Sequence, residues 1–428
     1  MSASEDGGAR AWTITALCAS FMSINYADKV IVGLAAVPLM AELHLSPSEF
    51  GLLGSAFFLF YSLSAVGVGF IADRVAAKWI IAAAALIWAL TLLPMAGTVS
   101  FAVLVASRII LGAAEGPSIA IANHCVFEWF SGPKRALPSA IVSIGSSIGV
   151  LFSAPALAWI IKTYDWHTAF LALALVGFAW VPIWLLVAKQ GPLSARRADV
   201  SPTSVATGER LPSLWPLLSQ RTFLGALACA YVGFSVLALV VAWLPPLLTI
   251  GEQIDGITTS WIVALAWTIE SACVVIAGWY STRLAMNGTS IRVARGYFAA
   301  GAICLAGVAL VFSVALPSTF ARVSMLILAF SAAQMIWPLL FALLSEISPA
   351  SRRGAVTSIF TALFTTAGLV VPALMGYFVQ VSNGSVQGYY NGLLYLGGLT
   401  VIGGLLGFWL INPESDRSRL EIKGLQQA

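Results

Sequence analysis

The sequence predicts an all-α membrane protein with twelve transmembrane helices in two pseudo-symmetric bundles of six. Composition, long apolar runs and a repeat between the two halves each support this fold class. Hydrophobic residues make up 59% of the 428 residues, and charged residues only 9%. Soluble chains carry roughly 25% charged residues. So few charges could not cover the surface of this chain in water, so most of that surface must face lipid.

The apolar runs are long enough to cross a bilayer, which takes about 20 residues. The first six fall at 11–40, 49–72, 78–97, 100–127, 136–161 and 167–188. The second six fall at 221–249, 258–281, 292–316, 320–345, 354–380 and 389–411. We predict an N-terminal bundle at 1–189, a Pro- and Ser-containing cytoplasmic linker at 190–219, a C-terminal bundle at 220–412 and a cytoplasmic tail at 413–428.

The basic residues predict the orientation. The N-terminus lacks the basic segment and cleavage site of a secretory signal, so the first apolar run is a retained span. With the N-terminus inside, 18 of the 22 Lys and Arg residues fall on inside segments and two on outside loops. Such a bias places both termini in the cytoplasm. We therefore expect a multi-pass protein of the inner (cytoplasmic) cell membrane.

Short segments at equivalent places in the two halves echo each other. The sequence GFIADR at 69–74 has a degenerate echo in GWYSTR at 278–283. The sequence SGPKRALPSA after the fourth run is echoed by SPASRRGAVTS after the tenth. Parallel repeats of six spans around a midplane site are one known plan of membrane transporters.

Several classes of protein are excluded by what the sequence lacks. It has no Walker lysine motif, no G-x-S-x-G sequence and no cluster of metal-ligand residues. Its five cysteines stand singly in apolar segments, which is typical of small buried side chains. We expect no enzyme activity, no cofactor, no metal and no nucleic-acid partner.

Five charged residues fall well inside predicted spans, away from the span ends: Asp28, Lys29, Arg108, Glu115 and Glu270. A charge at the bilayer centre costs about 2.5–3.5 kcal/mol on insertion scales, so such residues usually mark ion or substrate pathways. Ion pairs that only hold helices together are the alternative. For Glu270 two interpretations stay open, a third titratable site or a polar contact across helices.

Arg108 and Glu115 are seven residues apart on one predicted helix. Seven residues are nearly two turns, so both side chains point the same way, about 10 Å apart along the axis. The arginine stays charged and offers a planar fork to a carboxylate. The glutamate can take up a proton, because desolvation favours the neutral acid. One helix face thus combines a fixed cation with a titratable anion.

Four motifs together resemble the major facilitator superfamily, and within it the anion:cation symporter branch. They are INYADK at 24–29, GFIADR at 69–74 with Lys78, SRIILGAAEGP at 107–117 and EWFSGPKRA at 128–136. Ala76 and Ala77 depart from the loop motif, where a Gly and a basic residue are usual. The branch includes proton-coupled carriers of sugar acids and aromatic carboxylates and the sialin-type carriers.

The resemblance implies roles for several residues. Arg108 matches the substrate-binding arginine of the family, and Asp28 and Glu115 match its proton-carrying acids. Lys29 stands where the family has an arginine, and Tyr61 matches a tyrosine of its site. The further candidates for substrate contact are Tyr26, Ser146, Tyr231, Trp243, Thr361 and Thr365, the last two at positions where asparagine is usual.

Charged residues at the cytoplasmic span ends are expected to form a latch. The predicted gating set is Gly69, Asp73, Arg74, Lys78, Glu128, Arg135, Glu346 and Arg353. His124 is expected to make a hydrogen bond between helices, with a proton relay as the alternative. Gly145 and Gly149 form a small-x-x-x-small pattern that favours close helix packing.

These observations favour proton-coupled symport of a small organic anion by a monomer embedded in the lipid bilayer. Two rival functions remain open at this point. A drug/proton antiporter is disfavoured by the central cations Lys29 and Arg108. A membrane sensor that kept the fold and lost transport is disfavoured by the intact acids and loop motif.

Overall fold

The structure is a computed structural model, and it describes residues 8–64, 67, 75–131, 134–193, 214–349 and 352–416. Every regular element in this part of the chain is helical. Eleven helical segments there are long and apolar enough to cross a membrane. The remaining predicted span, 49–72, begins with α3 (Pro47–Phe58) and then reaches residues outside the described part. The all-α membrane fold class is therefore confirmed.

The chain forms two compact units. Unit 1 comprises residues 1–44, 56–209 and 255–264, and unit 2 comprises residues 45–55, 210–254 and 265–428. Helices α3 and α13 (Gly256–Met286) contribute to both. The other helices of unit 1 are α1 (Ala9–Leu34), α2 (Ala36–Glu42), α5 (Ala77–Leu92), η1 (Leu93–Ala96), α6 (Phe101–Glu115), α7 (Ser118–Phe127), α8 (Ala136–Thr163) and α9 (Trp166–Val187).

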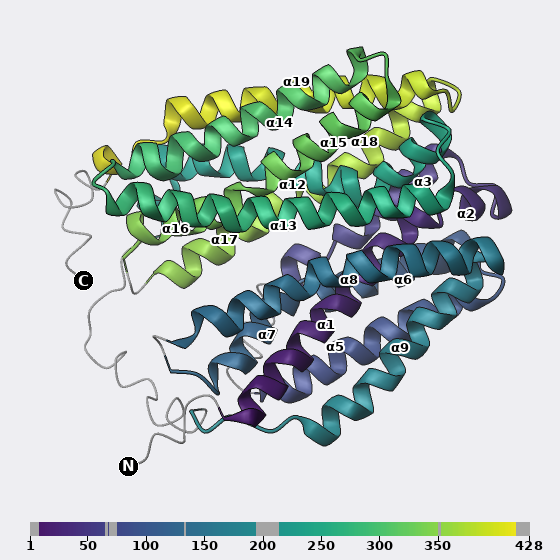
Figure 1. The fold of residues 1–428 in the computed structure, drawn as a ribbon, viewed down its shortest axis with the longest axis horizontal. Coiled ribbons are helices and arrows are strands. Elements are labelled where there is room, and N and C mark those ends of the chain that lie inside the picture. The colour runs from purple at the N-terminus through teal and green to yellow at the C-terminus, as the bar shows by residue number, and fades with distance from the viewer. Residues whose placement is uncertain are drawn as a thin grey trace. The chain divides into compact units, whose positions relative to one another are not determined.

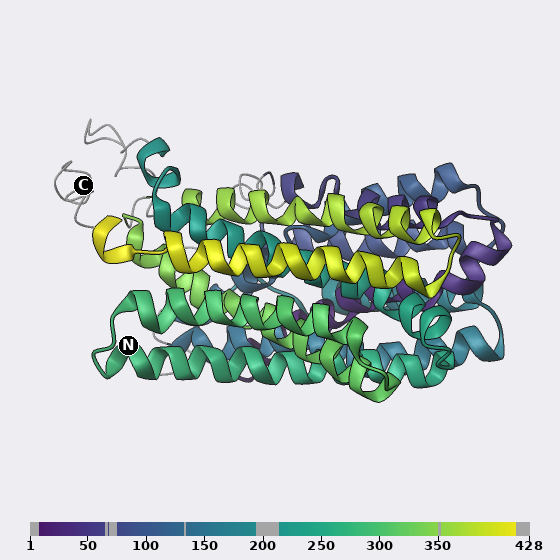
Figure 2. The same ribbon diagram turned by 90° about the horizontal axis from the view of Figure 1, so that it is seen from above.

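Unit 2 has the larger share of the helices. They are α11 (Trp215–Leu218), α12 (Arg221–Pro246), η4 (Leu247–Gly251), η5 (Arg292–Tyr297), α14 (Phe298–Ala315), α15 (Thr319–Gln334), α16 (Ile336–Ile347), α17 (Arg353–Thr365), α18 (Ala367–Val381) and α19 (Val386–Leu410). Helix α14 packs along α19 (Figure 1). Helix α19, yellow in Figure 2, also packs against α12 and α18.

Proline interrupts three spans that the sequence analysis takes as continuous. Helix α1 ends just before Ala35 and α15 just before Met335. In each case a proline follows three residues later, Pro38 or Pro338, and lacks the N–H that the last helical carbonyl would need. Pro117 likewise separates α6 from α7.

A fourth interruption, between α17 and α18 at Thr366, has a different cause. The Thr365 hydroxyl donates a hydrogen bond to the Thr361 carbonyl (2.7 Å), and the Thr366 hydroxyl donates to the Leu363 carbonyl (2.6 Å). Hydroxyls that bond to the preceding turn compete with the backbone ladder and bend helices.

Glycines set the closest helix contacts of unit 1. A Cβ at Gly145 would lie 2.2 Å from the Ala19 carbonyl oxygen, and one at Gly149 2.5 Å from that of Ser23. The Ser23 hydroxyl also donates to the Gly145 carbonyl (2.7 Å). Helix α8 therefore lies against α1 backbone to backbone, which is the packing role expected for this glycine pair.

Candidate functional site

Unit 1 contains a buried cluster of four charged residues. Helix α1 supplies Asp28 and Lys29, and α6 supplies Arg108 and Glu115. Their exposed fractions are 0% for Asp28, 7% for Lys29, 3% for Arg108 and 0% for Glu115. Charged side chains are rarely so enclosed unless they are paired or functional.

A second pair of glycines brings α6 into this position. A Cβ at Gly112 would lie 1.7 Å from the Phe57 carbonyl oxygen, and one at Gly116 would lie 2.1 Å from the Tyr61 carbonyl oxygen. No side chain fits at either place, so α6 rests directly on the backbone of 57–61. Arg108 lies one turn before Gly112, and Glu115 directly precedes Gly116. The contact therefore fixes the depth of both charged side chains.

Lys29 is the best-connected member of the cluster. Its Nζ lies 2.6 Å from Glu115 Oε2 and donates a hydrogen bond to Asn25 Oδ1, one turn earlier on α1. The same ammonium lies 4.5 Å from the ring centroid of Tyr26 and 5.8 Å from that of Tyr61. Aromatic faces attract a cation at such distances. Lys29 is thus held by an acid, an amide and aromatic rings.

Arg108 and Asp28 have unused polar atoms. The Arg108 guanidinium carbon lies 4.9 Å from the ring centroid of Phe57. Its Nε and Nη1 atoms, and both carboxylate oxygens of Asp28, have no hydrogen-bond partner within the described ranges. Buried polar groups are almost always hydrogen-bonded, and exceptions need an explanation. These atoms are therefore available to partners that the described part of the chain does not supply.

The cluster is balanced in formal charge. Two acids face two bases, and the charges of Glu115, Lys29 and Arg108 all act on Asp28. An anion that bound here alone would leave one uncompensated negative charge in a desolvated place, which is strongly unfavourable. A proton on either acid would restore neutrality. On electrostatic grounds, an anion and a proton would therefore bind to this arrangement more favourably together than the anion alone.

The remaining predicted contact residues of unit 1 divide into two groups. Tyr26 and Tyr61 lie at the cluster, against Lys29. Ser146 instead donates a hydrogen bond to the Ser143 carbonyl of its own helix (2.6 Å). Asn25 and Phe57 belong to the cluster and were not predicted. Asn25 could have been found from the INYADK motif, in which it directly precedes Tyr26. Nothing in the sequence distinguishes Phe57 from the aromatic residues around it.

The predicted contact residues of unit 2 do not gather around a charge. Trp243 is enclosed, with 1% of its surface exposed, and its indole N–H donates to the Pro372 carbonyl (2.9 Å). The structure therefore places Trp243 in the packed core of unit 2, and its contact with substrate stays a prediction. The Thr365 hydroxyl serves its own helix at Thr361. Tyr231 lies on α12, partly buried.

The predicted gating residues lie at helix ends where the structure describes them. Gly69, Asp73 and Arg74 lie outside the described residues. Lys78 donates to the Leu185 carbonyl (2.9 Å), and Arg353 donates to the Ser348 carbonyl (3.2 Å).

The two predicted gating acids that the structure describes each have partners within their own unit. Glu346 forms an ion pair with Arg295. Glu128 accepts a hydrogen bond from the Gly191 backbone N–H (3.1 Å) and lies 3.7 Å from His124 Nε2. Arg135 donates to the Phe130 carbonyl (3.0 Å). The gating role of all these residues stays a prediction.

The fold and the buried charges together define a class: a multi-pass helical membrane protein with an ionic centre among its spans. The sequence signature of the Major Facilitator Superfamily matches residues 16–334. The chain belongs to this superfamily, and it is a secondary transporter and not an enzyme.

Two curated relatives carry the resemblance to known carriers. The hexuronate transporter of Bacillus subtilis is 24% identical over 91% of this chain and 92% of its own length. The D-galactonate transporter of Escherichia coli O6:H1 is 23% identical over 89% of this chain and 91% of its own length. These are transporters of sugar acids, the kind expected for the anion:cation symporter branch.

A solved structure shows the same fold. A bacterial homologue of the human lysosomal transporter Spinster, in an inward-facing and unoccupied conformation, matches with a TM-score of 0.76 and 16% sequence identity. The match covers 96% of this chain and 99% of the other. At this identity the likeness shows the fold alone.

Proposed function

We propose that this transporter is a proton-coupled symporter of a small organic anion such as a sugar acid or an aromatic carboxylate. The observation that carries the proposal is the charge-balanced cluster of Asp28, Lys29, Arg108 and Glu115. Arg108 is the substrate anchor, because its guanidinium has unused donors. Asp28 and Glu115 are the proton carriers.

The cluster supports a substrate with one carboxylate anchor. Lys29 is already engaged by Glu115 and Asn25, which leaves Arg108 as the cation with free donors in the described part of the cluster. A guanidinium binds a carboxylate through two parallel hydrogen bonds. Relatives named for hexuronate and D-galactonate transport support a sugar acid. An aromatic acid fits the same anchor.

Transport would proceed by alternating access between an N-terminal bundle (1–189) and a C-terminal bundle (220–412). We place the protein in the cytoplasmic membrane with both termini inside, on the strength of the bias of Lys and Arg. Protonation of the cluster neutralises the bound anion, so the loaded form carries less uncompensated charge through the rearrangement than the anion-loaded, unprotonated form.

The test is uptake by the purified protein in proteoliposomes. A panel of labelled sugar acids and aromatic acids is offered with an inward proton gradient, an inward sodium gradient or neither. We expect one or more anions to accumulate above equilibrium with the proton gradient alone, and a protonophore to abolish this. Accumulation driven by sodium, or uptake of organic cations in exchange for protons, would overturn the proposal.

A further inference from the structure

Glu270 is a charged residue that the cluster in unit 1 does not use. It lies at the middle of α13, the 31-residue helix Gly256–Met286, and therefore far from both ends of that span. Its carboxylate accepts a hydrogen bond from the hydroxyl of Ser271, the next residue (3.0 Å). Within the described part of unit 2 it forms no ion pair.

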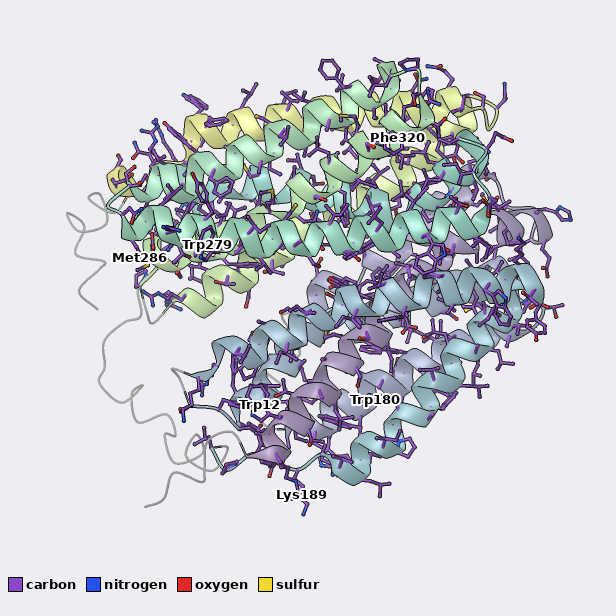
Figure 3. All side chains as sticks on the ribbon, in the orientation of Figure 1. Trp12, Trp180, Lys189, Trp279, Met286 and Phe320 are labelled. Carbon is purple, nitrogen blue, oxygen red and sulfur yellow. The ribbon has the colours of Figure 1, made fainter. Side chains whose placement is uncertain are left out.

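The direction of Glu270 follows from the exposure pattern of α13. With about 100° between successive residues, Glu270 lies within about 20° of Ala277 and Ser281 around the helix. These two residues are 0% and 3% exposed. Trp279, which Figure 3 labels, is 59% exposed and lies about 180° away. Glu270, itself half-buried, therefore lies on the side of α13 that packs against other helices and not on its outer face.

This side of α13 packs against other helices of unit 2. The Trp267 and Phe330 rings lie 5.1 Å apart, which joins α13 to α15. A Cβ at Gly278 would lie 3.4 Å from Pro338 on α16. The Ser281 hydroxyl donates to the Ala294 carbonyl of η5 (2.8 Å). Glu270 falls between these contacts, so the titratable groups that could reach it are those of α15, α16 and η5.

Those groups lie at the far ends of their helices. Arg322, in the first turn of α15, is bound to Glu252, and Arg295 of η5 is paired with Glu346 of α16. Counted at about 1.5 Å per residue from the contacts above, both ends lie about 16 Å along the axis from Glu270. Arg292 and Tyr297 lie at the η5 end as well. On α13 itself the nearest titratable side chain is Cys273, one turn further on.

We propose that Glu270 is a proton-binding site of the second half of the transporter, which loads and releases one proton in each cycle. This rests on the proton-coupled symport proposed above. A lone carboxylate in such a place is costly when charged, which favours its neutral, protonated form. One carboxylate and one hydroxyl are too few oxygens for a metal cation, which needs about six. A proton is the cation that fits.

The experiment measures the proton stoichiometry of substrate transport. In proteoliposomes with a fixed membrane potential, the substrate gradient that stops net flux is found at a series of imposed pH gradients. Each coupled proton shifts this balancing gradient about tenfold per pH unit. We expect Glu270→Gln to transport with one proton fewer than the wild type, and hence with a balancing gradient about tenfold smaller per pH unit.

The conservative variant separates titration from shape. Glu270→Asp keeps an ionisable carboxyl in a shorter side chain, so we expect the wild-type stoichiometry. Glu270→Gln keeps the shape and loses the proton. A wild-type stoichiometry in Glu270→Gln would overturn the inference about Glu270. If the wild type itself shows no dependence on the pH gradient, proton coupling as a whole fails, and the two failures are thereby distinguished.

Discussion

The interiors of the two units differ in their content of charged residues. The interior of unit 1 holds two acids and two bases, of which Lys29 and Glu115 are 2.6 Å apart. In unit 2 the rings of Trp337 and Phe364 lie 4.8 Å apart, and Phe234 lies 5.5 Å from Phe364. Packed rings also occur in unit 1, where those of Phe21 and Trp88 lie 4.4 Å apart, so the feature that distinguishes the described part of unit 1 is its buried cluster of charges. This contrast is why we propose that the anion binds in unit 1.

The contrast is reversed at the rims of the two units, by which we mean the helix ends around Glu42 and Glu252. In unit 1, Glu42 at the end of α2 accepts hydrogen bonds from Trp166 (2.7 Å) and His167 (2.8 Å), and its side chain is 45% exposed. In unit 2, Glu252 after η4 is bound by the Arg322 guanidinium (2.6 Å), and its side chain is 2% exposed. In unit 1, which has the charged interior, the acid at the helix end is thus exposed to water. In unit 2 the corresponding acid is buried in an ion pair.

The largest expected effect is on the acid of the ionic interior. Glu115→Gln should abolish accumulation driven by a proton gradient, because the amide cannot carry a proton, while substrate exchange at equal pH continues. Asp28→Asn should act in the same direction. Accumulation assays and counterflow assays on the same vesicles measure the two activities. Full gradient-driven accumulation in both variants would refute the assignment of the proton carriers.

The next effect concerns the anchor for the anion. Arg108→Lys should weaken substrate binding by more than about 100-fold, because the loss of a desolvated bidentate pair costs about 3–5 kcal/mol. An ammonium keeps the charge and lacks the planar fork. Arg283→Lys, on α13 of unit 2, is the matched control and should bind normally. Near-normal affinity of Arg108→Lys in a binding assay would remove the arginine from the site.

The third prediction tests the ion pair between Lys29 and Glu115 in unit 1. Lys29→Ala leaves Glu115 without its counter-charge, so the acid should keep its proton to higher pH and the midpoint of pH-driven uptake should move upward. Lys29→Arg keeps the charge and should leave the midpoint nearly unchanged. A panel of mono- and dicarboxylates tests selectivity at the same time. If Lys29→Ala changes neither midpoint nor affinity for any anion, Lys29 only holds helices together.

We expect the smallest effect from substitutions at the rims, which should change thermal stability. Burial favours the neutral acid at Glu252, but hydrogen bonds from Arg322, Tyr390 and Thr319 outweigh burial and hold its pKa below the usual value. This stabilisation is present above about pH 4.3, the ordinary value for glutamate, and is lost as the pH falls through the lower folded pKa. Glu252→Gln should therefore lower the thermal midpoint at neutral pH and flatten its dependence on acid pH.

Glu42→Gln supplies the comparison. Hydrogen bonds from His167 and Trp166 lower the pKa of Glu42, but its exposure to water weakens the interaction. We expect a loss of about 0.2–1 kcal/mol for this exposed site and about 1–3 kcal/mol for Glu252. Thermal unfolding in detergent as a function of pH measures both. Equal losses at the two rims would contradict the contrast drawn between them.

Much of the fold follows from composition and apolar run length, because a bilayer leaves few alternatives to helices. The interruptions at Ala35 and Met335 were not foreseen, although Pro38 and Pro338 mark them. The break at Thr366 depends on hydroxyl hydrogen bonds that propensity does not reveal.

The candidate site was predictable in its members and less so in its pairing. The positions of Asp28, Lys29, Arg108 and Glu115 inside apolar runs single them out. The sequence does not show which acid pairs with Lys29, and the structure pairs it with Glu115. That pairing depends on how closely α6 approaches its neighbours, which is set by Gly112 and Gly116 and is visible only in three dimensions.

The interruption between α6 and α7 affects the site through the backbone and not through a side chain. Pro117 has no N–H, so the Ala113 carbonyl loses its helical donor within two residues of Glu115. Glu115 is also the last residue of α6, where the peptide dipoles present their negative ends. Both effects disfavour a further negative charge near Glu115 and favour a hydrogen-bond donor there. The interruption thus leaves beside Glu115 a backbone carbonyl that has lost its helical donor, and this feature depends on one proline and on no charged residue.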